Sequence, residues 1–162
     1  MRDIDTIMKM LDETNSEKIQ QKGLRLARKV ENFNVFLRPA SMEDFSCPWD
    51  NCAIIVSEKS DVQLEQYLKE LLDWVAEPQI PGAMVIMNRL IKFSKVDKLA
   101  FVMEAFSVKL AIAQNDHRWL WALSFLLKNE KLMCCRGEIF RLRELNSHYL
   151  KAPQPLLQQR QT

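Results

Sequence analysis

Residues 71–90 read LLDWVAEPQIPGAMVIMNRL, and this stretch decides how the chain folds. Apolar residues at helical spacing end at Trp74, and two prolines follow three residues apart. Pro78 disfavours helical angles in the residue before it, so a helix should end near residues 74–76. Pro81 fits the opening turn of the next helix, which we expect to run to about Phe93. The stretch therefore predicts a helix–turn–helix step.

The inside of this step should be closely packed. Gly82 and Ala83 follow the second proline, and their small size allows the two helices to approach closely. Trp74 and Ile80 are the large apolar residues beside the turn, and we expect them to fill the junction.

The composition indicates a helical domain. The chain has 162 residues, of which 48% are hydrophobic, and it contains only three glycines. A chain of this length can bury about 70% of the surface that its unfolded form exposes. We expect one α-helical, repeat-like domain over residues 1–151 and a flexible C-terminal tail over residues 152–162, where two prolines stand among polar residues.

Toward the N-terminus the pattern predicts a helical hairpin. Apolar residues recur at helical spacing over residues 3–12, and a second helix should begin after Ser16 and run to about Val30. Residues 31–47 lose this spacing, so they form the longest predicted loop. Three apolar residues should pack that loop against the domain, namely Phe33, Val35 and Phe36.

Two further signals mark helix starts. Pro48 suits the first turn of a third helix. Ser60 with Gln63 is typical of a capping box, in which each side chain accepts a backbone N–H of the other. In the helix that follows, we expect Glu65 to pair with Lys69 four residues later.

Toward the C-terminus three more helices are predicted, over about residues 96–114, 117–129 and 136–149. The first of them is apolar on more than one side, so we expect it to be central. The total is about eight helices in consecutive antiparallel hairpins, which could stack as repeats of roughly 35 to 45 residues. A compact irregular α bundle is the alternative.

Residue types with catalytic or metal-binding chemistry do not form a recognisable site. The six cysteine and histidine positions lack the two-residue spacing of a zinc knuckle, and they are Cys47, Cys52, Cys134, Cys135, His117 and His148. The acidic pairs Glu43–Asp44 and Asp73–Glu77 are typical of solvated carboxylates, and no glycine-rich phosphate loop occurs. We therefore expect no enzyme activity, no cofactor and no metal.

Positive charge gathers in residues 116–162, which hold eight Lys and Arg against four Asp and Glu. Arg118, Arg136 and Arg143 are candidates to contact a partner, and a solvated helix pair is the alternative explanation. The sequence pI of about 8.3 is modest for a protein that neutralises several phosphates, so nucleic acid is the less favoured partner.

Two tryptophans in the same segment are candidate contact residues. Trp119 and Trp121 are two positions apart, so on one helix they point in directions about 200° apart. A partly exposed tryptophan beside arginines has the composition of a protein-binding hot spot. The alternative is a central helix that buries both.

One set of residues in the core of the chain recurs in a known pattern, namely Trp49, Asn51, Cys52 and Ala53, then Ser60 and Asp61, then a helix that ends in Trp74, then Pro81, Gly82 and Ala83. With these elements, about residues 47–93 resemble a small bacterial family of unknown function with HEAT-like helical hairpins. Pro78 departs from the family pattern. The resemblance implies a right-handed HEAT-like stack in which Trp49, Ser60, Trp74, Pro81 and Gly82 are structural.

Some members of that family are suspected toxin-immunity proteins, so the resemblance implies a non-catalytic module that binds another protein, and a toxin in particular. A nucleic-acid-binding or repair-type helical-repeat protein is the alternative. No run of about 18 uncharged apolar residues occurs, and we expect a cytoplasmic protein with no membrane partner. The oligomeric state is left open.

Overall fold

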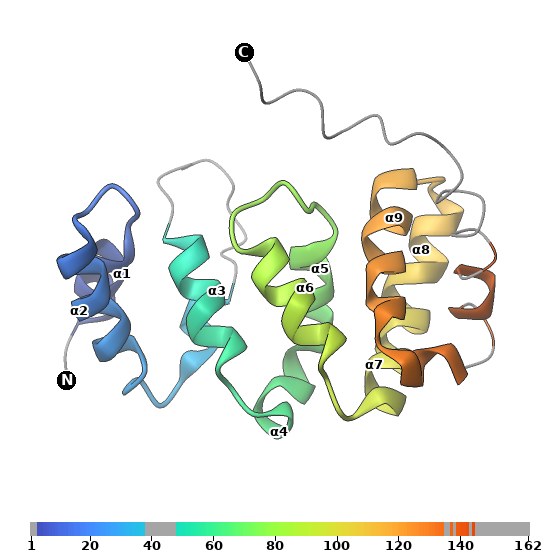
Figure 1. Ribbon diagram of the computed structural model, residues 1–162, viewed down its shortest axis with the longest axis horizontal. Coiled ribbons are helices and arrows are strands. Elements are labelled where there is room, and N and C mark those ends of the chain that lie inside the picture. The colour runs from blue at the N-terminus through green and yellow to red at the C-terminus, as the bar shows by residue number, and fades with distance from the viewer. Residues whose placement is uncertain (1–2, 38–47, 135–136, 138, 143, 145–162) are drawn as a thin grey trace, which may run out of the picture.

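The chain is all-α in the part that its structure describes. The computed structural model describes residues 3–37, 48–134, 137, 139–142 and 144. Among these residues every regular element is helical and none is a strand, which confirms the predicted fold class. The helices form a row along the longest axis of the molecule, with residues 4–27 at one end and residues 96–134 toward the other (Figure 1).

The first two helices form the predicted hairpin. Helix α1 (Ile4–Leu11) is capped by Asp3, whose carboxylate accepts the N–H of Asp5, and α2 (Glu17–Ala27) packs against it. Ser16 stands at the start of α2, but its hydroxyl makes no capping hydrogen bond. Both helices also contact the next one, α3 (Trp49–Ser57).

A short helical turn (Phe33–Phe36) leads from α2 toward α3 and packs on it. Phe33 and Phe36 are buried as predicted, whereas Val35 is exposed, so the prediction for Val35 was wrong. A helix of three residues per turn places residues 33 and 36 on one side, and the two residues between them, Asn34 and Val35, face solvent. Residues 38–47 of the predicted loop lie outside the described residues.

The next helix is interrupted once. A tight turn (Glu65–Tyr67) separates α4 (Asp61–Leu64) from α5 (Leu68–Val75). The capping box of Ser60 and Gln63 is present, as predicted.

The predicted Glu65–Lys69 pair is wrong. Glu65 pairs with Lys95 and lies 3.6 Å from Lys98, while Lys69 pairs with Asp73 at 2.9 Å. The tight turn changes the angular spacing between positions 65 and 69, and cations from α7 (Val96–Val102) and from the residue before it reach Glu65 instead.

The step between α5 and α6 (Ala83–Ile91) has the expected packing and one unexpected detail. Trp74 is fully buried and donates its indole N–H to the Pro81 carbonyl at 3.1 Å, and Ile80 is buried beside the turn. Pro81 was predicted in the first turn of α6. It instead precedes Gly82, the N-cap of the helix, because Gly82 takes a left-handed conformation with φ 78° before the helix begins.

The predicted helix over residues 96–114 is present without a break from Val96 to Ala113, but its middle is π-helical and it is not buried on every side. A π-helical segment (Met103–Val108) joins α7 to α8 (Lys109–Ala113). Phe101, Phe106 and Leu110 are exposed. The wider π turn changes the angle between successive side chains, so a pattern that looked apolar all round leaves three large residues at the surface.

Helix α9 (His117–Phe125) returns beside α8 and continues through a tight turn (Leu126–Lys128), followed by another (Glu130–Cys134). The helix predicted over residues 136–149 falls largely outside the described residues, as does the tail over residues 152–162. Of its described positions, Ile139 and Leu142 are buried and Phe140 is exposed.

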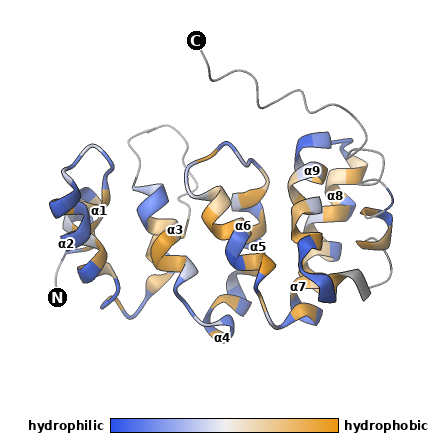
Figure 2. Cartoon of the chain, in the orientation of Figure 1, coloured by the Kyte–Doolittle hydropathy of each residue, from blue (hydrophilic) through white to orange (hydrophobic). Residues whose placement is uncertain are grey.

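The core runs through the whole row of helices, as the recurrence of apolar residues from α3 to α9 shows (Figure 2). Helix α2, at the end of the row, is largely hydrophilic (Figure 2). Consecutive helices pack on each other in the pairs α1–α2, α5–α6 and α8–α9, and α3 packs mainly on α6, which comes three α-helices later in the chain.

Candidate protein-interaction surface

Helix α9 and its last turn present a row of cationic and aromatic side chains to solvent. Arg118 and Lys128 are exposed, and Trp121 and Phe125 between them are partly exposed. Their spacing of three, four and three residues places all four on one side of the helix. We call this row, Arg118, Trp121, Phe125 and Lys128, the α9 face.

Contacts within the α9 face fix its aromatic pair. The ring centroids of Trp121 and Phe125 lie 4.6 Å apart at an interplanar angle of 71°, which is an edge-to-face arrangement. The Lys128 ammonium lies 4.8 Å from the centroid of the Phe125 ring, within cation–π range. A rigid aromatic pair loses little side-chain entropy when a partner covers it, which suits a binding surface.

The two tryptophans of α9 have different environments. Trp119 is buried, with 9% of its surface exposed, and Trp121 is partly exposed on the opposite side. The other two tryptophans, Trp49 and Trp74, are buried as well, so Trp121 is the single tryptophan of this chain that solvent reaches substantially. The two-residue spacing predicted this divergence, but it did not reveal which tryptophan faces outward.

Charges along α9 are of one sign. Between Asp116 and Glu130 the only residues that are charged at neutral pH are Arg118 and Lys128. The carboxylate of Asp116 accepts the N–H of Trp119 at 3.0 Å and caps the helix. Arg118 has no ion-pair partner among the described residues.

The other predicted contact residues, Arg136 and Arg143, lie outside the described part of the chain. Sequence reasoning missed Phe125, although its position four residues after Trp121 was a readable signal of a shared helix side.

The residues attributed to the family motif are structural in this chain. Trp49 and Trp74 are buried, Ser60 caps α4, and Pro81 accepts the hydrogen bond from Trp74. A Cβ atom on Gly82 would lie 2.7 Å from the Cβ of Ala53. Through these contacts they lie in the packing among α3, α5 and α6.

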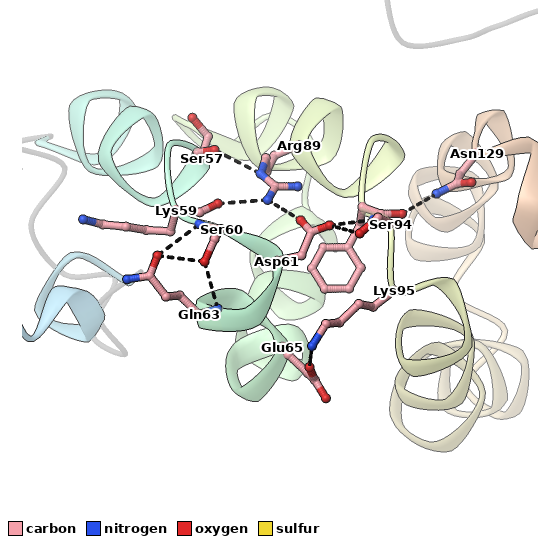
Figure 3. Close-up of polar contacts among 11 residues, drawn as sticks. Ser57, Lys59, Ser60, Asp61, Gln63, Glu65, Arg89, Ser94, Lys95 and Asn129 are labelled. Carbon is pink, nitrogen blue, oxygen red and sulfur yellow. Dashed lines mark hydrogen bonds and ion pairs between the residues drawn. The ribbon is translucent and has the colours of Figure 1, made fainter.

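A polar cluster centred on Arg89 and Asp61 joins α6 to its neighbours (Figure 3). Arg89 donates to the Ser57 carbonyl at 3.0 Å, to the Lys59 carbonyl at 2.9 Å, and to the carboxylate of Asp61. The other oxygen of Asp61 accepts the backbone N–H of Ser94 at 2.8 Å and its hydroxyl. Because the guanidinium donates to groups of the protein, we interpret the cluster as a structural junction.

The pKa of Asp61 reflects this junction. Burial by itself raises the pKa of the carboxyl, but hydrogen bonds from Ser94 and Arg89 outweigh it, and the pKa falls below its ordinary value of 3.8. Asp61 therefore stays ionised at neutral pH and holds its donors.

Within the described part of the chain, Cys52 and Asp73 are two of the residues that the sequence offered for chemistry. Burial raises the pKa of the Cys52 thiol to about 12, so this thiol is a poor nucleophile. Asp73 pairs with Lys69 at 2.9 Å, and the Glu43–Asp44 pair lies outside the described residues. Across the described ranges, no group of three or more His, Cys, Asp or Glu could hold a metal ion.

Comparison of the chain with protein-family models, with curated proteins and with solved structures found no match. Within the described residues no helix is both long enough and apolar enough to span a bilayer. The functional argument therefore rests on the α9 face.

Proposed function

We propose that this protein is a non-catalytic protein-binding module, and that it neutralises a bacterial toxin by binding it directly. The α9 face carries the proposal. It combines tryptophan and arginine, which are enriched among the residues that dominate binding energy, with a fixed aromatic pair between them. The identification of the partner as a toxin rests on the family resemblance of residues 47–93.

The scaffold that we propose for this surface is a HEAT-like right-handed stack of helical hairpins. The row of helices along the long axis and the packing of consecutive helices on each other are consistent with such a stack. In a stack of this kind, an outward helix side is held rigidly by the layer beneath it. The buried Trp119 and Leu123 beneath the α9 face provide that support.

Nucleic acid is the second candidate, because aromatic rings beside arginine and lysine also stack on bases. The α9 face supplies two cations, and a protein that tracks a phosphate backbone uses more. Weak, salt-sensitive binding would be the most that this surface could give to a single strand.

A growth-rescue assay tests the proposal. Proteins encoded beside the gene of this chain are expressed singly in a sensitive host, and any that stops growth is co-expressed with the chain. We expect the wild-type chain to restore growth and to co-purify with that protein. The double variant W121A/F125A should do neither, because it removes the aromatic pair.

A matched variant separates loss of the surface from loss of the fold. Val62 is 69% exposed on α4, remote from α9 in sequence, so V62A removes exposed apolar area elsewhere. V62A should rescue growth and unfold as the wild type does. W121A/F125A should unfold at a somewhat lower temperature, because Phe125 packs partly against the core, and circular dichroism at the growth temperature checks that this variant is still folded there. Full rescue by W121A/F125A would overturn the assignment of function to the α9 face.

A further inference from the structure

We propose that the α9 face binds an acidic helical segment of the partner protein. This segment carries apolar side chains between two carboxylates. The inference rests on the proposed function, and it specifies the chemistry of the partner at this surface. Its basis is the order of charges and rings along the α9 face.

The spacing of the two cations sets the first requirement. Arg118 and Lys128 are ten residues apart along a continuous helical path, which corresponds to a separation of about 15 Å. A second helix that lies along α9 places carboxylates at matching positions when its own acidic residues are about ten positions apart. Glutamate and aspartate side chains are long enough to tolerate a shift of one residue.

The aromatic pair sets the second requirement. Trp121 and Phe125 lie between the cations, and their partly exposed rings form the apolar middle of the surface. Apolar residues at positions i and i+4 of the partner helix would cover these rings and exclude water from the two outer ion pairs.

Charge complementarity excludes a basic partner. Arg118 lies in the first turn of α9, where the positive end of the helix dipole adds to its charge. Asp116, which precedes α9, accepts a backbone N–H as the helix cap. The charged side chains of the α9 face itself are both cations, Arg118 and Lys128, so a lysine-rich segment lying along this face would meet like charges.

The same spacing disfavours a polyanion. Phosphates along a single strand are much closer together than the two cations, and the space between the cations is filled by aromatic rings. An acidic amphipathic helix matches both the charges and the apolar centre of the surface.

A displayed peptide library tests the inference with a defined probe. Helix-biased random peptides of about 16 residues, enough for four turns, are selected on the wild-type chain after depletion on W121A/F125A. We expect the enriched peptides to carry carboxylates on both sides of an apolar pair. Enrichment of neutral or basic peptides would overturn the inference, and so would no enrichment over the depleted pool.

The enriched peptide is then synthesised and titrated against the full chain. Binding is followed by protection of tryptophan emission from acrylamide, a signal to which Trp121 contributes most because the other three tryptophans are buried. R118E/K128E should weaken binding at least about tenfold, with the larger part from Arg118. R25E/K29E, an equal charge change at the end of α2, should leave the affinity unchanged.

Two outcomes distinguish this inference from the function on which it rests. If growth rescue requires Trp121 and Phe125 but the enriched peptides are not acidic, the acidic helix is wrong and the protein-binding function stands. If rescue does not require the α9 face, the assignment of function to this surface fails and the inference fails with it, whereas failure of the wild-type chain to rescue growth or to co-purify would overturn the proposed function itself. Binding of a fluorescent oligothymidylate that R118E/K128E abolishes would also overturn the inference.

Discussion

Gly82 determines the geometry of the step between α5 and α6. Its φ of 78° is one that side chains rarely adopt, and the space beside it is already filled by Ala53 and by the Trp49 carbonyl. Gly137 has a similar φ of 81°, but the nearest atoms to its missing Cβ belong to the end of the Glu104 side chain. Substitutions at these two glycines can therefore distinguish the energetic cost of backbone strain from the cost of overpacking.

We expect Gly82→Ala to lower the free energy of unfolding by about 2–4 kcal/mol, the sum of left-handed strain and overpacking. Gly137→Ala should cost only the strain, about 1–2 kcal/mol, because the Glu104 carboxylate can move away. Urea titration of both variants measures the difference. Equal losses at the two positions would show that the packing against Ala53 contributes nothing.

Sequence patterns predicted an interaction correctly where both interacting residues lie within the same turn of one helix. The Ser60–Gln63 capping box was predicted because its two residues are three apart and need nothing else. Glu65 was assigned to Lys69 for the same kind of reason, but its partners come from the segment that begins α7. The π-helical segment carried no sequence signal, and the exposure of Phe106 followed from it. The spacing of residues along one helix carries no information about which residues of other helices they contact.

The junction of α4 with α6 leads to a pH prediction for Asp61. Its pKa is lowered by folding, so its ionised form stabilises the fold above the unfolded pKa, and this contribution disappears as pH falls through the folded value. We expect Asp61→Asn to be less stable than the wild type at pH 7, by about 1.5–3 kcal/mol for the lost charged hydrogen bonds. The difference should shrink as the pH falls below about 4.

Chemical denaturation from pH 7 to pH 3 measures this difference. Glu70 is an exposed carboxylate on α5, so Glu70→Gln should change stability little at every pH. A deficit of Asp61→Asn that stays constant across the range would mean that shape, rather than charge, holds Arg89 and Ser94.

Across the whole molecule, two buried asparagines connect layers that are distant in sequence. Asn51 of α3 donates to the Leu11 carbonyl at 2.7 Å and to the Gln20 side chain at 2.9 Å. Asn129 donates to the Phe93 carbonyl at 3.0 Å. Each amide satisfies a carbonyl at the end of a helix in another layer, where the helix itself leaves carbonyls without partners.

We expect Asn51→Ala to lower the opening free energy of α1 and α2 by about 1–3 kcal/mol, because it leaves the Leu11 carbonyl buried without its donor. Amide hydrogen exchange followed by mass spectrometry should show faster exchange in residues 4–27 and unchanged exchange in α6. Asn129→Ala is the matched change, and it should accelerate exchange near residues 90–93 instead. Faster exchange along the whole chain in both variants would mean that the layers open only together.

The packing of consecutive helices has a kinetic consequence. Because α1 and α2 pack on each other, as do α5 and α6, across short connections, little loop-closure entropy is lost before the first packed pair forms. Refolding from urea should therefore resemble that of helical proteins, with a main phase on the order of milliseconds or faster. The hairpin of α1 and α2 can assemble as soon as it leaves a ribosome, before the residues that form α9 have been synthesised.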